Sequence, residues 1–327
     1  MTRQRSGGGE RTRVASRLSK PLAGTYAGLS AKSTGAVEAS KPASGREIRA
    51  GPGLYLVATP IGNAADITLR ALDVLTRADV IACEDTRITA KLLAVHGISR
   101  PLVRYDEHTA RTAGPALIER IGRGECVALV TDAGTPLISD PGERLVRDCI
   151  DAGLPVLAVP GASAALTALC VAGLPAARFL FAGFLAPRSV GRRRRELLAL
   201  ADVQATLVLL ESPKRLATAL ADMADTLGSR DAAVARELTK LFEEVRRGSL
   251  PDLADYYRRA GPPKGEVTIV VAPPLAPPPP ADAEVDRLLG EALESMSPRD
   301  AATEIAKATG MPRRQLYARA IALKAGV

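Results

Sequence analysis

The stretch that most constrains the fold runs from residue 127 to 142 and reads VALVTDAGTPLISDPG. It continues a short apolar, β-branched run, Cys126 to Val130, which is typical of a strand buried on both faces. Small and turn-forming residues then end the strand. Asp140 suits a helix N-cap and Pro141 the first helical position, so we expect a helix from Asp140. This order places Asp132 to Pro136 at the carboxyl end of a strand, where open α/β sheets bind ligands.

The same alternation of strand, polar loop and helix fills residues 53–173. Polar or small residues follow the other strands as well, at 59–63, 84–87, 105–108 and 160–163. Alternation of this kind predicts a mostly parallel sheet with helices on both faces. The expected strands are residues 54–58, 80–83, 102–103, 126–130 and 155–159, and the expected helices are 66–78, 88–95, 109–123, 140–152 and a last one ending at 172.

The alternation restarts after Gly173-Leu174-Pro175, which indicates a second α/β domain over residues 176–272. Its charged strand ends could face the loops of the first domain across a cleft, a common place for a small-molecule site. The expected strands are 179–184, 205–210, 232–238, 243–248 and 266–272, and the expected helices are 192–200, one ending near 227, and 252–259.

The two ends of the chain differ from these domains. Residues 1–50 are rich in Gly, Ser, Arg and Lys without apolar periodicity, which predicts a disordered basic tail. Residues 273–281 form a stiff proline-rich linker. Residues 282–327 predict three helices with a Gly310 turn, the outline of a helix-turn-helix. A solvated helical hairpin packed on the body of the protein would show the same pattern.

Charge says little about what the folded body binds. The net charge is +8, but residues 1–50 hold ten Lys or Arg against three Asp or Glu and so carry +7 of it. Only local basic clusters can then argue for nucleic-acid binding, and the candidates are residues 192–195 and 246–247. A hydrophobic content of 46% over 327 residues is enough for about two buried cores.

Cysteine and apolar patterns point to a reducing compartment. Four widely spaced cysteines without a CxxC pair are expected to be buried thiols: Cys83, Cys126, Cys149 and Cys170. With two histidines in the chain, no metal site is expected. No apolar run approaches the length of a membrane span and the N-terminus lacks a signal-peptide core, so the sequence predicts a cytoplasmic protein without membrane attachment.

The charged residues at the strand ends are compatible with more than one chemical role. No Ser/His/Asp or Cys/His arrangement is readable. Glu84 and Asp85 could bind a metal or act as a base, but neighbouring Arg87 would lower their pKa and favour plain charge pairing. The residues alone predict a two-domain α/β protein with a polar cleft.

Seven runs in register add a resemblance to this picture. They resemble the tetrapyrrole methylase superfamily over about residues 53–272, and within it the branch that methylates the 2′ hydroxyl of a cytidine in small-subunit ribosomal RNA. The runs are ATPIGN from Ala58, EDTR from Glu84, TDAGTPLISDPG from Thr131, PGASAALTAL from Pro160, ESPKR from Glu211, ARELTK from Ala235 and KGE from Lys264.

This resemblance implies an architecture and a reaction. It implies two α/β domains of tetrapyrrole methylase type with the cofactor cleft between them, and a C-terminal helical module such as many members carry. The implied cofactor is S-adenosyl-L-methionine, and the implied product is a 2′-O-methylated cytidine in the decoding region. The implied partners are small-subunit ribosomal RNA or the assembled small subunit, with a second copy of the chain in a homodimer.

The resemblance also implies roles for particular residues. For methyl transfer to a ribose hydroxyl, Glu84 or Asp85 would accept the proton or orient the hydroxyl, and Arg87 or Lys240 would hold a phosphate or stabilise oxyanion charge. The cofactor would lie against three loops and a wall from the second domain, made of Thr59, Pro60, Gly62, Asp132, Ala133, Gly134, Thr135, Pro136, Pro160, Gly161, Ser163, Ala235, Arg236 and Glu237.

Two other functions compete with this one. A tetrapyrrole C-methyltransferase would share the fold and the cofactor but would need an enclosed pocket for a flat polycarboxylate. A non-enzymatic nucleic-acid-binding regulator would act through the C-terminal helices. Deleting residues 282–327 separates the last alternative, because a regulator would lose its function whereas an enzyme would keep cofactor binding.

Overall fold

The computed structural model describes residues 50–275 and 281–324. The predicted basic tail, except for its last residue, and most of the proline-rich linker lie outside these residues. Within the described ranges, no helix is both long enough and apolar enough to cross a membrane.

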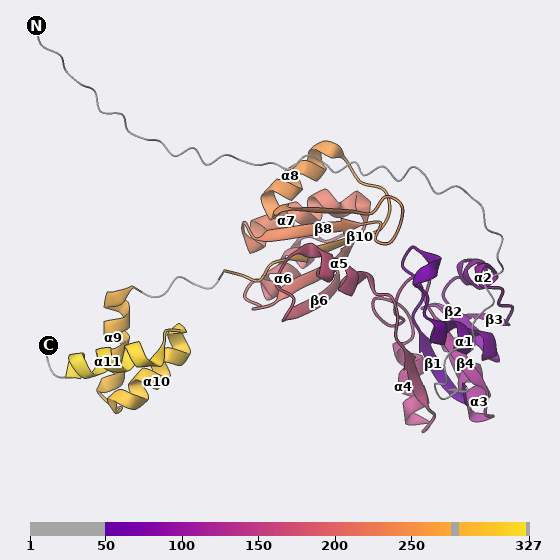
Figure 1. Cartoon of the computed structure of the whole chain (residues 1–327), viewed down its shortest axis with the longest axis horizontal. Coiled ribbons are helices and arrows are strands. Elements are labelled where there is room, and N and C mark those ends of the chain that lie inside the picture. Colours follow the sequence, from indigo (N-terminus) through magenta and orange to yellow (C-terminus); the bar gives the residue numbers. More distant parts are fainter. Residues whose placement is uncertain (1–49, 276–280, 325–327) are drawn as a thin grey trace, which may run out of the picture. The chain divides into compact units, whose positions relative to one another are not determined.

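The first sheet has five strands, all parallel, in the order β3-β2-β4-β1-β5. Its strands β1 to β4 are labelled at the right of Figure 1. β1 and β4 are central, and β4 is buried along its whole length, as its apolar sequence predicts. The predicted parallel sheet is confirmed. Its strands are β1 (Gly53–Val57), β2 (Val80–Cys83), β3 (Leu102–Arg104), β4 (Cys126–Val130) and β5 (Val156–Val159).

Helices cover both faces of this sheet. α1 (Leu69–Arg77) and α2 (Thr86–Val95) pack on one face, and a short 3-10 turn (Ala64–Asp66) precedes α1. α3 (Ala110–Gly122) and α4 (Glu143–Asp151) pack on the other face. The alternating apolar residues of the strands divide between these two cores, which is the reason that a parallel sheet needs both.

The expected start of α4 is wrong. The helix begins at Glu143 with Gly142 as its N-cap, and Asp140 and Pro141 belong to the preceding loop. Gly142 has a φ of 139°, and a Cβ there would lie 2.8 Å from Leu129 Cδ2. Two non-glycine residues of the loop, Leu137 and Ser139, have φ values of 73° and 68°. The segment after β4 is therefore a long, strained loop, and such loops concentrate at functional sites.

The second sheet is mixed, with the order β6-β7-β10-β8-β9. β6 and β7 are parallel, whereas the pairs β7–β10, β10–β8 and β8–β9 are antiparallel. The predicted second α/β layer is confirmed. Its strands are β6 (Phe179–Phe184), β7 (Thr206–Glu211), β8 (Asp231–Arg236), β9 (Glu244–Ser249) and β10 (Val267–Val271).

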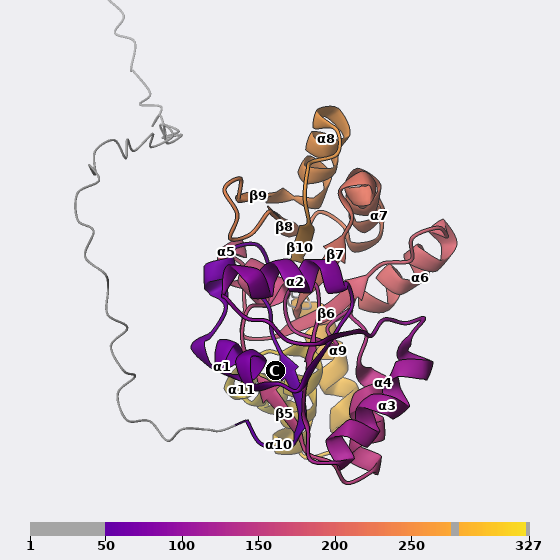
Figure 2. The same cartoon turned by 90° about the vertical axis from the view of Figure 1, so that its right-hand side faces the viewer.

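The helices of this part come from two places in the chain. One face of the second sheet is covered by α6 (Val190–Leu200), α7 (Leu216–Leu227) and α8 (Leu250–Ala260). A 3-10 turn (Pro213–Arg215) directly precedes α7. Figure 2 shows α7 and α8 side by side. α5 (Ala164–Ala172) covers the other face, although it follows β5 of the first sheet directly. The division of the chain at residue 173 stays an interpretation of chain order.

The C-terminal helices form a module with its own core. α9 (Asp282–Leu293), α10 (Pro298–Thr309) and α11 (Arg313–Lys324) pack on one another around Leu289 and Leu316. Gly310 ends α10 with a φ of 71°. The guanidinium of Arg319 bonds to the carboxylates of two α9 residues, Asp282 and Asp286, at 2.6 and 2.5 Å. Arg319 therefore holds the module together and is not free for a polyanion.

The cysteines follow the prediction with one exception. Cys83, Cys126 and Cys149 are buried free thiols in the first sheet and its helices, and burial raises the pKa of Cys126 to about 11. Cys170 on α5 is exposed, so its predicted burial is wrong. The helix turns its alanine face toward the second sheet and leaves this position outside.

Candidate active site

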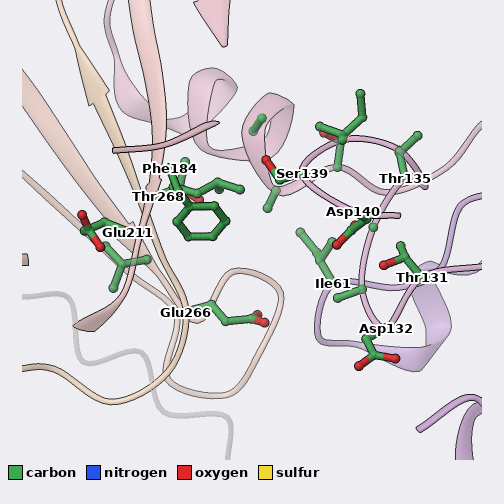
Figure 3. Close-up of a pocket in the computed structure, with 18 of the residues that line it drawn as sticks. Ile61, Thr131, Asp132, Thr135, Ser139, Asp140, Phe184, Glu211, Glu266 and Thr268 are labelled. Atoms are coloured by element: carbon green, nitrogen blue, oxygen red, sulfur yellow. The ribbon is translucent and has the colours of Figure 1, made fainter. Parts of the chain in front are cut away.

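A cavity of about 450 Å³ opens at the loops that follow the strands of both sheets (Figure 3). Its size is typical of a small-molecule site. Its wall on the side of the first sheet consists of Ile61, Glu84, Thr131, Asp132, Ala133, Gly134, Thr135, Ile138, Ser139, Asp140, Ser163, Ala164 and Ala165. The second sheet and its loops contribute Phe181, Phe184, Leu210, Glu211, Ser212, Pro213, Gly265, Glu266, Val267 and Thr268.

Hydrogen bonds bring three of the predicted loops together. The buried hydroxyl of Thr59 donates to the Thr131 carbonyl at 3.0 Å. The backbones of Thr59 and Gly134 form an antiparallel bridge. Thr135 donates its hydroxyl to the Ala162 carbonyl at 3.1 Å, which ties the loop after β4 to the loop after β5. The loops thus support one another and form one end of the cavity.

The cavity is acidic. Five carboxylates line it, those of Glu84, Asp132, Asp140, Glu211 and Glu266, and no Lys or Arg is among its described lining residues. Outside the lining, Arg215 pairs with Glu211 at 2.5 Å and Lys240 with Glu266 at 3.4 Å, so Glu84, Asp132 and Asp140 carry the uncompensated charge. Burial raises the pKa of Glu84, and the charges of Asp132 and Asp140 raise it further. Burial also raises the pKa of Asp132 and of Asp140. Such a group of partly buried carboxylates favours a bound cation, because a positive charge relieves their mutual repulsion.

Apolar surfaces complete the cavity. In Figure 3 the ring of Phe184 lies on one side and Ile61 on the other, while Asp140 and Glu266 extend from opposite walls. Phe184 is 54% exposed, so its ring is open to a ligand. A ligand with a flat apolar part and a positive charge matches this combination of walls.

Lys240 lies beside this cavity in an ion-paired group. Its Nζ is 2.9 Å from Glu237 Oε1 and 3.4 Å from Glu266 Oε2. Burial alone would lower the pKa of Lys240, but the hydrogen bond that Lys240 donates to Glu237 and the charges of both carboxylates outweigh burial and raise the pKa. Gly62 is close by: a Cβ there would lie 2.5 Å from Lys240 Cγ. The predicted Gly62 loop therefore shapes the lysine's position.

Glu84 and Asp85 have opposite environments. Asp85 is the N-cap of α2 and accepts hydrogen bonds from the backbone and side chain of Arg87, which holds its pKa well below the ordinary range. The expected plain charge pairing is therefore confirmed for Asp85. Glu84 instead faces the cavity with a raised pKa, and Thr131 Oγ1 lies 3.5 Å from its Oε2. Of these two carboxylates, Glu84 has the environment of a proton acceptor.

A polar cavity adjoins the first one at Glu84. It shares Glu84, Asp132 and Ser139 with that cavity and is otherwise lined by Asp85, Arg104, Asp106, Glu107, His108 and Pro141. Hydrogen bonds from the Thr109 backbone and from the side chains of Thr109 and Arg104 hold the pKa of Asp106 at about 2. Asp106 is therefore a fixed, ionised group in the cavity next to Glu84.

The structure sorts the predicted cofactor residues by place. Asp132, Ala133, Gly134, Thr135 and Ser163 line the acidic cavity. Six others belong to the supporting loops without lining it: Thr59, Pro60, Gly62, Pro136, Pro160 and Gly161. Gly161 is needed for close approach, since a Cβ there would lie 2.9 Å from Ala58 Cβ.

The predicted second-domain wall is placed differently. Ala235 is buried in the core between α5 and the second sheet. Arg236 bonds to Glu244 at 2.8 Å, and Glu237 pairs with Lys240. The wall is formed instead by residues that sequence reasoning missed, Phe181, Phe184 and Thr268, and by Glu211 and Glu266 from two of the quoted runs. Ile138 and Asp140 are also additional, and both lie inside the TDAGTPLISDPG run.

The basic clusters proposed as RNA contacts have largely internal partners. Arg193 is buried and bonds to Asp222 at 2.5 Å, joining α6 to α7. Arg247 donates to the carbonyls of Val171 and Ala172 at the end of α5. Arg193 is buried, so its assignment as an RNA contact is wrong, whereas Arg247 is exposed and its assignment stays a prediction.

Comparison with known proteins assigns the chain to a class. The family model described as tetrapyrrole (corrin/porphyrin) methylases matches residues 53–254, which span both sheets except β10. A solved cobalt precorrin-4 methyltransferase superposes with a TM-score of 0.53 at 20% identity, over 67% of this chain and 94% of that one. A diphthine synthase superposes with a TM-score of 0.51 at 17% identity, over 67% and 89%. The fold class predicted from the sequence is confirmed.

More similar relatives narrow the class. A protein named ribosomal RNA small subunit methyltransferase I from Mesorhizobium japonicum is 54% identical over 84% of this chain and 92% of its own length. One of the same name from Erythrobacter litoralis is 53% identical over 84% and 96%. The model described as RsmI C-terminal HTH domain matches residues 279–324. The chain therefore belongs to the tetrapyrrole methylase family, in the branch of ribosomal RNA small subunit methyltransferase I.

Proposed function

We propose that this enzyme methylates the 2′ hydroxyl of a cytidine in the decoding region of small-subunit ribosomal RNA. As a member of this methyltransferase branch it uses S-adenosyl-L-methionine as the methyl donor for ribosomal RNA. The observation that supports the cofactor site is the acidic cavity, with five carboxylates and no cation among its described lining residues.

The residues of this cavity fit the proposed cofactor. S-adenosyl-L-methionine carries a sulfonium and an ammonium, which suit a wall formed by Asp132, Asp140 and Glu266. Its adenine ring suits the apolar surface of Ile61 and Phe184. When bound, the cofactor supplies an electrophilic methyl group on sulfur.

We propose that Glu84 accepts the proton of the ribose hydroxyl. The side chain of Glu84 lies where the acidic cavity meets the polar cavity after β3, so a ribose in the polar cavity would be next to it. The pKa of Glu84 is raised by burial and by neighbouring carboxylates, which makes it a better proton acceptor than Asp85. Lys240, kept cationic by Glu237 and Glu266, is available to stabilise negative charge at the reacting oxygen.

The same charge argues against a tetrapyrrole substrate. A flat polycarboxylate would place negative groups against the carboxylates of the acidic cavity and of the adjoining polar cavity. A ribose is neutral, and its phosphates can stay outside. The substrate class proposed is therefore RNA, as naked small-subunit RNA or the assembled subunit, and we further propose that the enzyme acts in the cytoplasm as a homodimer.

Two measurements test this proposal. Calorimetric titration with S-adenosyl-L-methionine should show binding, and Glu84→Gln should weaken that binding only a few-fold, because the other carboxylates of the cavity remain. Transfer of a tritiated methyl group to small subunits from cells lacking the gene should make one cytidine linkage alkali-resistant, and Glu84→Gln should slow the transfer about 100-fold. Binding without transfer to RNA would contradict the RNA substrate, and a fully active Glu84→Gln would contradict the role of the carboxylate.

A further inference from the structure

A second cavity of about 500 Å³, separate from the acidic cavity, is lined in part by Glu237. It shares no lining residue with the acidic cavity, but its residue Lys264 directly precedes Gly265 and Glu266 of that cavity. Its walls come from the end of β8, the β8–β9 loop, α8 and the segment before β10. They consist of Arg236, Glu237, Phe242, Glu244, Tyr256, Tyr257, Ala260, Gly261, Pro262, Pro263 and Lys264.

Aromatic rings define this cavity. Phe242 is 69% exposed, so its ring is open to a ligand, and Tyr256 is 37% exposed with Arg246 over one face of its ring. The guanidinium of Arg246 lies 3.7 Å from the centroid of the Tyr256 ring, and Tyr257 meets Tyr256 edge to face at 5.0 Å. Open aromatic rings beside an arginine are the usual means by which proteins stack single-stranded nucleic-acid bases.

The charge of this cavity differs from that of the acidic one. Its carboxylates are neutralised: Glu244 bonds to both Arg236 and Arg246 at 2.8 and 2.7 Å, and Glu237 bonds to Lys240. Lys264 is exposed and has no ion pair in the described part of the chain. A phosphate next to a stacked base would therefore meet a cation here rather than a group of carboxylates.

The loop between β8 and β9, which carries Phe242, is held rigidly. Glu237 and Thr239 adopt φ values of 50° and 64°, and the Thr239 amide donates to Glu243 at 2.7 Å. This strained turn fixes the loop that presents Phe242.

We infer that this cavity binds an unpaired base of the substrate RNA outside the site of methyl transfer. The inference rests on the proposed function. Stacking on Phe242 and Tyr256 would hold this base while the target ribose lies at Glu84, beside the cofactor in the acidic cavity. The cavity thus positions the substrate and takes no part in the transfer of the methyl group.

The test compares Phe242→Ala with a matched variant. Methyl transfer to small subunits is measured as KM and kcat, together with fluorescence quenching of a short single-stranded RNA that contains 2-aminopurine. Loss of one stacked base should raise KM about tenfold and remove the quenching. Phe242→Tyr should restore both. Phe179→Ala removes an equally apolar ring that is 44% exposed and lies at the start of β6, outside the lining of both cavities. This variant should change neither KM nor the quenching.

Cofactor affinity and oligomeric state separate the possible failures. Phe242→Ala should bind S-adenosyl-L-methionine as the unaltered enzyme does, and should sediment at the same rate. An active enzyme in which Phe242→Ala keeps its KM overturns the inference alone. A change in sedimentation would assign Phe242 to contact with a second copy and also overturn it. An unaltered enzyme that binds the cofactor but methylates no RNA would overturn the proposed function.

Discussion

The acidic cavity and the aromatic cavity are built from neighbouring segments but have opposite chemistry. The first has five carboxylates, of which Glu84, Asp132 and Asp140 have no ion pair in the described part of the chain, and no lining cation. The second has open rings, carboxylates that are all ion-paired and an exposed lysine. Gly265 and Lys264 are adjacent in the chain yet line different cavities. The contrast shows how an enzyme with a cationic cofactor and a polyanionic substrate can keep them in separate electrostatic environments.

Charge reversal in the acidic cavity should give the largest effect. Asp140→Lys places a cation beside Glu84 and Asp132, where it would neutralise the site and repel a sulfonium. We expect binding of S-adenosyl-L-methionine to weaken about 100-fold, measured by calorimetry. Asp151→Lys makes the same change at the exposed end of α4 and should leave the affinity unchanged. Equal effects of both variants would show that only the overall charge matters.

The pH dependence of cofactor binding should be a smaller effect of the same groups. Glu84, Asp132 and Asp140 have pKa values raised above their ordinary 4.5, 3.8 and 3.8, and Glu211 and Glu266 face them. A cation prefers the ionised carboxylates, so affinity is complete above the raised pKa values and is lost as the pH falls through them. We expect about tenfold weaker binding at pH 5 than at pH 7.

Proton release gives an independent measure of that effect. Near pH 5, cofactor binding should release protons, seen as a dependence of the calorimetric heat on the buffer. Asp140→Asn should reduce the release. A constant affinity between pH 5 and 7 in the unaltered enzyme would mean that these carboxylates do not face the positive charge.

The smallest expected effect belongs to Lys264. Lys264→Gln should weaken RNA binding a few-fold and lower the slope of log affinity against log salt by about one, because one phosphate contact is lost. Its cofactor affinity should be that of the unaltered enzyme. An unchanged salt slope would remove Lys264 from the RNA surface while leaving the aromatic rings as the binding groups.

Sequence reasoning succeeded where local pattern decides structure. Most strands of both sheets were predicted because they are compact apolar runs between turn residues, as β4 and β10 show, although β9 reads EVRRGS. It failed at α4, because the good capping pair Asp140-Pro141 lies in a loop whose path depends on Gly142 fitting against Leu129. A contact of that kind joins distant residues and leaves no local pattern.

The site was predictable in part for the same reason. The motif runs marked the loops. Pattern alone could not show that the Thr59 hydroxyl bonds to the Thr131 carbonyl within the loops while the Asp140 side chain lines the cavity. The basic run at 192–195 suggested RNA contacts, and only the fold shows that Arg193 is buried against Asp222. A partner 29 residues away cannot be read from a charge run.

The position of α5 limits how this protein can be divided. Ala165, Ala168 and Leu169 of α5 cover Val208, Ala233 and Val270 of the second sheet, yet they precede the Gly173-Leu174-Pro175 break in the chain. A fragment that starts at residue 176 would leave one face of its sheet open to water. During synthesis on the ribosome, α5 must likewise wait for β10, about 100 residues later, before its apolar face is covered. Expression fragments of the second half should therefore begin before Ser163, the N-cap of α5.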